Sequence, residues 1–198
     1  AWVQVGAGDF DAAGARIAAC GAAADAAAPY AVRAFYYQVL ADERRERGDA
    51  PAALAAHLAG METAQRAGDA ARVAFHDGMA ALYTANAQHV STSVEVLGRM
   101  GSHRLLAQLM LVGALVGRDP DILKAAESES RRAGDPLLLL DVLHAVRASA
   151  RLPEARVLAR RLADATHGAL GDSLRRRPAL RWALSDAGRA GSGRDRGR

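Results

Sequence analysis

The fold is decided by a turn motif whose clearest copies are Gly8-Asp9-Phe10-Asp11-Ala12-Ala13 and Gly48-Asp49-Ala50-Pro51-Ala52-Ala53. Each copy joins one alanine-rich stretch to the next. Weaker copies begin at positions 86, 117 and 150, so that successive turns are 40, 38, 31 and 33 residues apart. Self-similarity at such a period indicates stacked helical hairpins, because one hairpin cannot bury its own apolar face.

The composition favours an all-α fold. Apolar residues make up 51% of the 198-residue chain, and nearly half of them are alanine, whereas aromatic residues make up only 5%. Alanine is the strongest helix former and packs at short range, and a sheet protein needs far more β-branched and aromatic side chains. No apolar run approaches the roughly 20 residues that a membrane span requires. The only cysteine, Cys20, is expected to be a small buried thiol, which fits a cytoplasmic protein.

Breakers and apolar spacing predict the helices. The expected ranges are 10–24, 29–47, 50–67, 70–85, 93–100, 104–116, 120–133, 136–149, 153–166 and a capping helix over 172–185. Asp119-Pro120 and Asp135-Pro136 each place a capping aspartate before a first-turn proline, which predicts sharp helix starts. The polar stretch 89–93 is expected to be a loop. Residues 1–186 therefore form the predicted repeat domain.

Both ends of the chain carry further expectations. The start at Ala1-Trp2 lacks a methionine, and residues 2–7 look like the end of a helix, so we interpret the chain as a fragment of a longer protein. Residues 187–198 consist mainly of Gly, Ser and Arg, which predicts a disordered tail. The basic character is local: residues 1–170 hold 18 basic and 19 acidic side chains, whereas residues 171–198 hold eight Arg and three Asp.

The motif in its helical setting resembles the tetratricopeptide repeat. Tyr37, Leu40-Ala41, Gly48-Asp49 and Ala53 match the family's large residue, its leucine–small pair, its turn and its small residue in the second helix. The likeness covers about residues 1–166 and implies a right-handed α-α superhelix of four to five hairpins. The alanine- and arginine-rich style resembles the C-terminal repeat regions of large bacterial signalling proteins, namely Ser/Thr kinases, nucleotide-binding activators and cyclases.

This resemblance implies a regulatory module that binds a protein or peptide, in concert with upstream domains of the same polypeptide. In the family, the first helix of each hairpin lines the inner surface, so its non-core positions become the candidate partner-binding residues. They are Phe35, Gln38, Asp42 and Arg45 in one repeat, with His76 and Tyr83 in the next. For Phe35 and Tyr83, packing between hairpins is an equal alternative.

The C-terminal segment offers a different function. Arg175, Arg176 and Arg177 with Trp182 would contact phosphates and stack on bases, which makes a nucleic-acid-binding adaptor the alternative. An enzyme is not predicted, because no nucleophile–base pair, phosphate-binding loop or histidine ligand spacing stands out. A cofactor or metal is likewise not expected, and no membrane partner is predicted.

Overall fold

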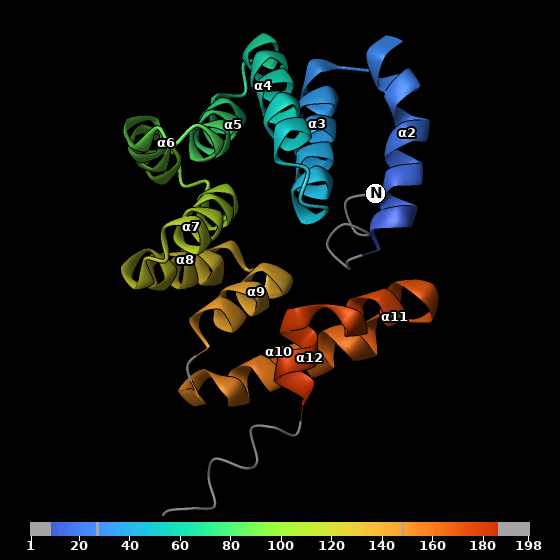
Figure 1. Cartoon of the computed structure of the whole chain (residues 1–198), viewed down its shortest axis with the longest axis vertical. Coiled ribbons are helices and arrows are strands. Elements are labelled where there is room, and N and C mark those ends of the chain that lie inside the picture. Colours follow the sequence, from blue (N-terminus) through green and yellow to red (C-terminus); the bar gives the residue numbers. More distant parts are fainter. Residues whose placement is uncertain (1–8, 27, 148, 186–198) are drawn as a thin grey trace, which may run out of the picture.

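The computed structural model describes residues 9–26, 28–147 and 149–185, and in these ranges the chain is all-helical (Figure 1). The expectations for residues 2–7 and 187–198 lie outside the described residues. The eleven α-helices of the described part are α2 (Phe10–Ala26), α3 (Tyr30–Glu46), α4 (Ala50–Ala67), α5 (Ala70–Tyr83), α6 (Ala87–Arg99), α7 (His103–Gly117), α8 (Pro120–Ala133), α9 (Pro136–Val146), α10 (Leu152–Ala165), α11 (Gly168–Arg176) and α12 (Pro178–Leu184).

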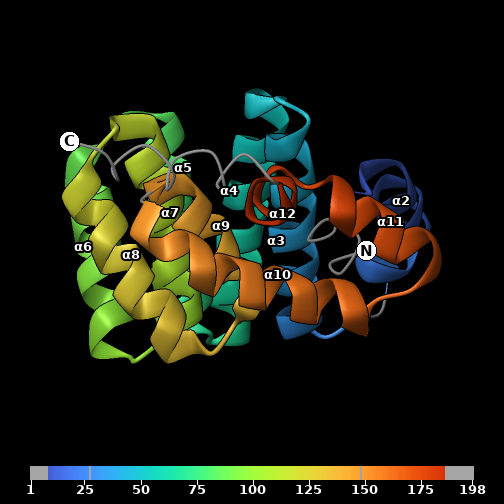
Figure 2. The same cartoon turned by 90° about the horizontal axis from the view of Figure 1, so that it is seen from below.

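Successive helices pack side by side and follow an open arc (Figures 1 and 2). The closest neighbours are consecutive: α3 with α4, α4 with α5, α5 with α6 and α7 with α8. Alternate helices also touch, since α5 contacts α7 and α7 contacts α9. At the end of the chain, α12 packs on both α9 and α10. Each helix therefore covers the apolar face of its neighbours, as the turn period predicts for paired helices.

The helix starts follow from side-chain caps. The Asp49 carboxylate accepts from the Ala52 amide at 3.1 Å, and the Asp69 carboxylate accepts from the Arg72 amide at 3.0 Å. The predicted starts at Pro120 and Pro136 are confirmed, because Asp119 and Asp135 each accept two amide hydrogen bonds from the first turn. These caps satisfy amides that would otherwise lack a partner, and the prolines occupy positions that need no amide.

Three local predictions are wrong. The stretch 89–93 is helical, because Asn86 caps α6 by accepting from the His89 amide at 3.3 Å. The expected capping helix over 172–185 is two helices, α11 and α12, which meet where Pro178 cannot continue the first. Cys20 is exposed rather than buried.

Apolar side chains gather in two larger clusters. The first joins α5, α6 and α7 through Phe75, Met79, Leu97 and Leu109, all fully buried. The second joins the C-terminal helices, with its buried members Leu139, Leu140, Leu143, Ala155, Ala159, Leu174, Ala179, Leu180 and Ala183. Smaller residues, chiefly alanine, fill the remaining contacts between helices.

Two glycines allow the central helices to approach closely. A methyl group added at Gly60 of α4 would lie 2.4 Å from Cε1 of His76 on α5. At Gly78 of α5, it would lie 2.7 Å from Cβ of Ser93 on α6. Side-chain carbons do not approach so closely, so α4, α5 and α6 are spaced for glycine at these two positions.

We expect Gly60→Ala to destabilise the protein by about 1–3 kcal/mol, because the new methyl group has to displace the buried His76 ring. Gly113→Ala is the matched control. A methyl group there meets Leu82 Cδ2 at an ordinary 3.6 Å, so the higher helix propensity of alanine should raise stability by up to about 1 kcal/mol. Urea unfolding followed by circular dichroism gives both values. Equal behaviour of the two variants would contradict the close approach.

Candidate functional site

A cluster of polar side chains joins α3 to α7 on the inner side of the arc. We call this cluster, composed of Gln38, Asp42, Arg45 and Gln108, the inner polar seam. Gln108 Nε2 donates to both Asp42 oxygens, at 2.9 and 3.0 Å, and Gln38 Nε2 donates to Gln108 Oε1 at 3.4 Å. The partners are 66 and 70 residues apart in sequence, so these bonds form only when the helices follow the arc.

Arg45 supplies the positive charge of the seam. Its Nη1 donates to Asp42 at 2.9 Å and its Nη2 donates to Glu46 at 3.0 Å. Burial raises the pKa of Asp42, whereas Arg45 and the Gln108 hydrogen bond lower it. Asp42 is only 5% exposed. A carboxylate so deeply buried depends on its two donors for compensation.

Charged pairs continue the inner face toward the C-terminus. Arg104 Nε donates to Asp135 at 3.0 Å, and Arg177 Nη2 donates to Asp141 at 2.5 Å. Burial raises the pKa of Asp141 to about 6, with Arg177 lowering it and Glu46 raising it further. Because Glu46 ends α3 while Asp141 lies in α9, charges on opposite parts of the arc influence one another.

Two buried histidines link α4 to α5 behind this surface. The Nδ1 atoms of His57 and His76 are 3.0 Å apart, and neither residue is exposed. Burial is the main cause that lowers the pKa of His57 to about 3 and that of His76 to about 4. Both rings are therefore neutral at pH 7, and one Nδ1–H donates to the other Nδ1.

The structure corrects the expected exposure of three candidate residues. His76 is fully buried, Gln38 is 1% exposed and Asp42 is 5% exposed, so none of them is a freely accessible non-core position. The physical reason is the curvature of the arc, which brings α7 against α3 and packs α4 over α5. Sequence reasoning also missed Gln108, Arg104 and Asp141, because their partners are on helices far away in the sequence.

The remaining candidates differ in accessibility. Phe35 packs beside the buried residues Ala13, Ile17 and Val39, and the Arg72 guanidinium lies 5.7 Å from its ring centre. Packing between helices thus accounts for Phe35. The Arg45 side chain remains 25% exposed. The Tyr83 ring is partly buried, with its centre 6.0 Å from that of His57.

The residues of the nucleic-acid alternative belong to the C-terminal cap. Arg175 and Arg176 are exposed, but Arg175 Nη1 donates to Asp172 at 3.3 Å and Arg176 donates to Ser173 Oγ at 3.2 Å. Arg177 is the partner of Asp141. Trp182 packs against the C-terminal core, with its ring centre 5.6 Å from that of His144. The structure does not gather these four side chains into one shared surface.

Within the described ranges, no three side chains among His, Cys, Asp and Glu come together in an arrangement suited to a metal ion. In the same ranges, no helix has the length and apolar character to cross a membrane. Comparisons with protein-family models, with curated proteins and with solved structures found no match to this chain.

Replacing Gln108 tests the seam. We expect Gln108→Ala to lower the free energy of unfolding by about 1–3 kcal/mol, because the buried Asp42 carboxylate loses a donor. The exposed Gln88 on α6 gives the matched variant Gln88→Ala, for which a change within about 0.5 kcal/mol is expected. Both values come from urea unfolding at neutral pH. A Gln108→Ala protein as stable as the parent would show that the hydrogen bonds of Gln108 contribute nothing to the stability of the fold.

The histidine pair predicts loss of stability in mild acid. The unfolded chain takes up two protons near the usual histidine pKa of about 6.5, whereas the folded pair resists them. Its contribution is therefore complete above about pH 6.5 and is lost as the pH falls through the folded pKa values of about 4 for His76 and about 3 for His57. Asp141, with its raised pKa, acts in the opposite direction, since its contribution is lost as the pH rises through about 6.

We expect the double variant His57→Gln with His76→Gln to show a much flatter dependence of unfolding free energy on pH between these limits. The exposed His167 supplies the control, His167→Gln, which should retain the slope of the parent protein. Urea midpoints measured at several pH values give the slopes. The same slope in the double variant and the parent would exclude the buried pair as the source.

Proposed function

We propose that this chain is a protein-interaction module, a short right-handed superhelix of paired helices that holds a peptide or partner domain on its inner face. The module would serve a larger bacterial regulatory protein in the cytoplasm. The observation that supports this most directly is that side chains far apart in sequence interact: Gln108 of α7 donates to Asp42 of α3, and the charge of Glu46 on α3 acts on Asp141 of α9. Figure 1 shows the arc that these three helices follow.

The charge of this face favours a protein partner over nucleic acid. Its acidic members are Asp42, Glu46, Asp135 and Asp141, and its basic members are Arg45, Arg104 and Arg177. Each arginine contacts a carboxylate of the same chain. Nucleic-acid binding depends on cations that neutralise phosphates, whereas protein interfaces combine both signs of charge with aromatic and arginine side chains.

The accessible part of the inner face indicates where a partner would bind. Arg45 and Tyr83 are partly exposed, and Glu46 lies at the exposed end of α3. Tyrosine and arginine are the residue types that contribute most to interface energies. The buried Asp42, which accepts from Arg45, would then hold Arg45 in position, and Gln38 would act only through Gln108, rather than contact the partner directly.

The test is retention of bacterial proteins by the full chain and its variants. We expect Glu46→Lys to remove the specific partner, because it reverses an exposed charge without disturbing the core, and Arg45→Ala and Tyr83→Ala to weaken its retention at least about tenfold. Arg99→Ala on α6, which removes an exposed arginine paired with Glu95, is the control for loss of a surface arginine and should retain the partner.

Quantitative mass spectrometry of the retained proteins gives the comparison. Circular dichroism confirms that each variant is folded. A partner retained equally by Glu46→Lys, Arg45→Ala and Tyr83→Ala would place binding elsewhere. Capture of nucleic acid that disappears with Arg175→Ala and Arg176→Ala, and with added salt, would favour the nucleic-acid adaptor instead.

A further inference from the structure

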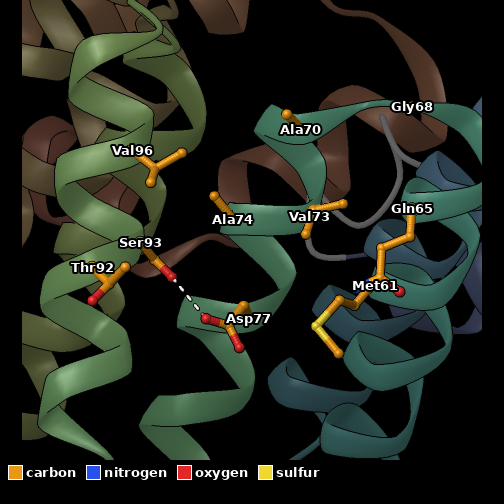
Figure 3. A pocket seen from close by; sticks show the side chains of 10 residues that line it. All are labelled: Met61, Gln65, Gly68, Ala70, Val73, Ala74, Asp77, Thr92, Ser93 and Val96. Atoms are coloured by element: carbon orange, nitrogen blue, oxygen red, sulfur yellow. Dashed lines mark hydrogen bonds between the residues drawn. The ribbon is translucent and has the colours of Figure 1, made fainter.

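A groove of about 560 Å³ lies between α4, α5 and α6 (Figure 3). Its walls and floor come from all three helices. The lining residues are Met61, Gln65, Gly68, Ala70, Val73, Ala74, Asp77, Thr92, Ser93 and Val96. The volume falls within the range of about 300–1,000 Å³ that is typical of small-molecule sites.

Small residues keep this groove open. On α5, the positions 70, 73, 74 and 77 follow the helical spacing that places side chains on one face. The side chains of Ala70 and Ala74 are short, so they do not fill the groove. Met61 and Val96 form apolar walls on opposite sides (Figure 3). From Ala70 to Asp77 the helix advances by seven residue steps, so the floor is about 10 Å long. The groove thus accommodates a narrow, extended apolar group.

A carboxylate closes one end of this apolar floor. Asp77 is the one lining residue, among those described, that carries a charge. Its Oδ2 accepts from Ser93 Oγ at 3.3 Å, and Ser93 is only 2% exposed (Figure 3). The other carboxylate oxygen lies 3.2 Å from His89 Nδ1. Ser93 therefore fixes the carboxylate in place, while 32% of the Asp77 side chain remains exposed to a ligand.

Within the described residues, the arginines that follow the groove-lining residues of α4 and α5 pair with other carboxylates, whereas the basic side chain of His89 lies beside Asp77. Arg66 donates to Glu62, and Arg72 donates to Asp69, each within its own helix or cap. His89 contributes a positive charge only when it is protonated. The groove thus combines an apolar floor with a carboxylate end, which is complementary to an apolar chain that ends in a cation.

We propose that the groove between α4, α5 and α6 is a binding site for a linear aliphatic primary amine. The ammonium group donates to Asp77, and the alkyl chain lies along Ala74, Val73 and Ala70. The lining residues include no aromatic side chain, so nothing in the groove favours a planar ring over an alkyl chain. This site shares no residue with the inner polar seam, and it stands independently of the proposed protein partner.

The full chain is titrated with n-octylammonium, and 1-octanol and octanoate provide neutral and anionic probes of the same length. Amide chemical shifts report the position, and titration calorimetry reports the affinity. We expect octylammonium to shift amides of α5 and α6 around the groove and to bind at least about tenfold more tightly than either other probe, since a charge-assisted hydrogen bond contributes about that factor.

Two variants test the two halves of the site. Asp77→Asn should reduce octylammonium affinity about tenfold and abolish the preference over octanol. Ala70→Leu should block the floor and weaken all probes, and because Ala70 is exposed at the start of α5, this change spares the core. The matched controls are Asp121→Asn on α8 and Ala87→Leu at the exposed start of α6, both outside the groove.

Binding of all three probes with equal affinity would reduce the site to an apolar cleft and overturn the proposal. Shifts that map elsewhere, or octylammonium affinity unchanged in Asp77→Asn and Ala70→Leu, would overturn it as well. Failure of all three probes to bind would also contradict the proposal. That result is the one expected if a partner helix, rather than an amine, occupies the groove.

Discussion

Close approach of helices through alanine and glycine is the constraint on which the rest of this structure depends. More than half of the buried apolar residues in the described part are alanine. Each alanine buries little area, so the free energy gained from the hydrophobic effect at each contact is small. The helices gain further stability from van der Waals contacts, because they pack closely. Gly60 and Gly78 provide such close contacts between the central helices. They allow the close spacing of α4, α5 and α6.

The same spacing explains why polar groups are buried. With α4 and α5 so close, His57 and His76 meet inside the interface, where only the neutral, hydrogen-bonded pair is tolerated. The curvature then brings Gln108 to Asp42. A buried polar group costs free energy unless it has a partner, so these pairs favour one arrangement of the helices over others. Apolar alanine contacts are less selective, because one small side chain fits much like another.

The sequence predicted those features that depend on neighbouring residues. Asp119-Pro120 and Asp135-Pro136 contain cap and first-turn proline together, so their helix starts could be predicted closely. The start of α6 could not be predicted in the same way, because the first turns of this helix are polar and resemble a loop in sequence, although Asn86 caps them. The break at Pro178 carried a local signal, because the residue before a proline disfavours the helical conformation, and the prediction of one helix over 172–185 did not take it into account.

The candidate site required information that is not local. Whether position 38, 42 or 76 is exposed depends on how far the arc bends, and no spacing within α3 or α5 encodes that bend. Gln108 gave no signal, because a lone glutamine in a helix is usually solvated. The groove beside Asp77 could not be predicted from the sequence either, because it results from small side chains on three helices rather than from any sequence motif.

Helix α5 carries residues of two candidate sites, since Asp77 lines the groove and Tyr83 is a candidate partner-binding residue. His76 and Asp77 are consecutive, so their side chains point about 100° apart around the helix. His76 contacts α4, whereas Asp77 faces the groove and bonds α6 through Ser93. Farther along the same helix, Tyr83 lies near enough to Arg45 for the two to interact electrostatically. In an array where each helix contacts mainly its neighbours, a shift of α5 would act directly on the histidine pair and would reach the inner polar seam only through the electrostatic interaction of Tyr83 with Arg45. The tight packing at Gly60 and Gly78 makes such a shift costly for α5 alone, so that α4 and α6 have to move with it.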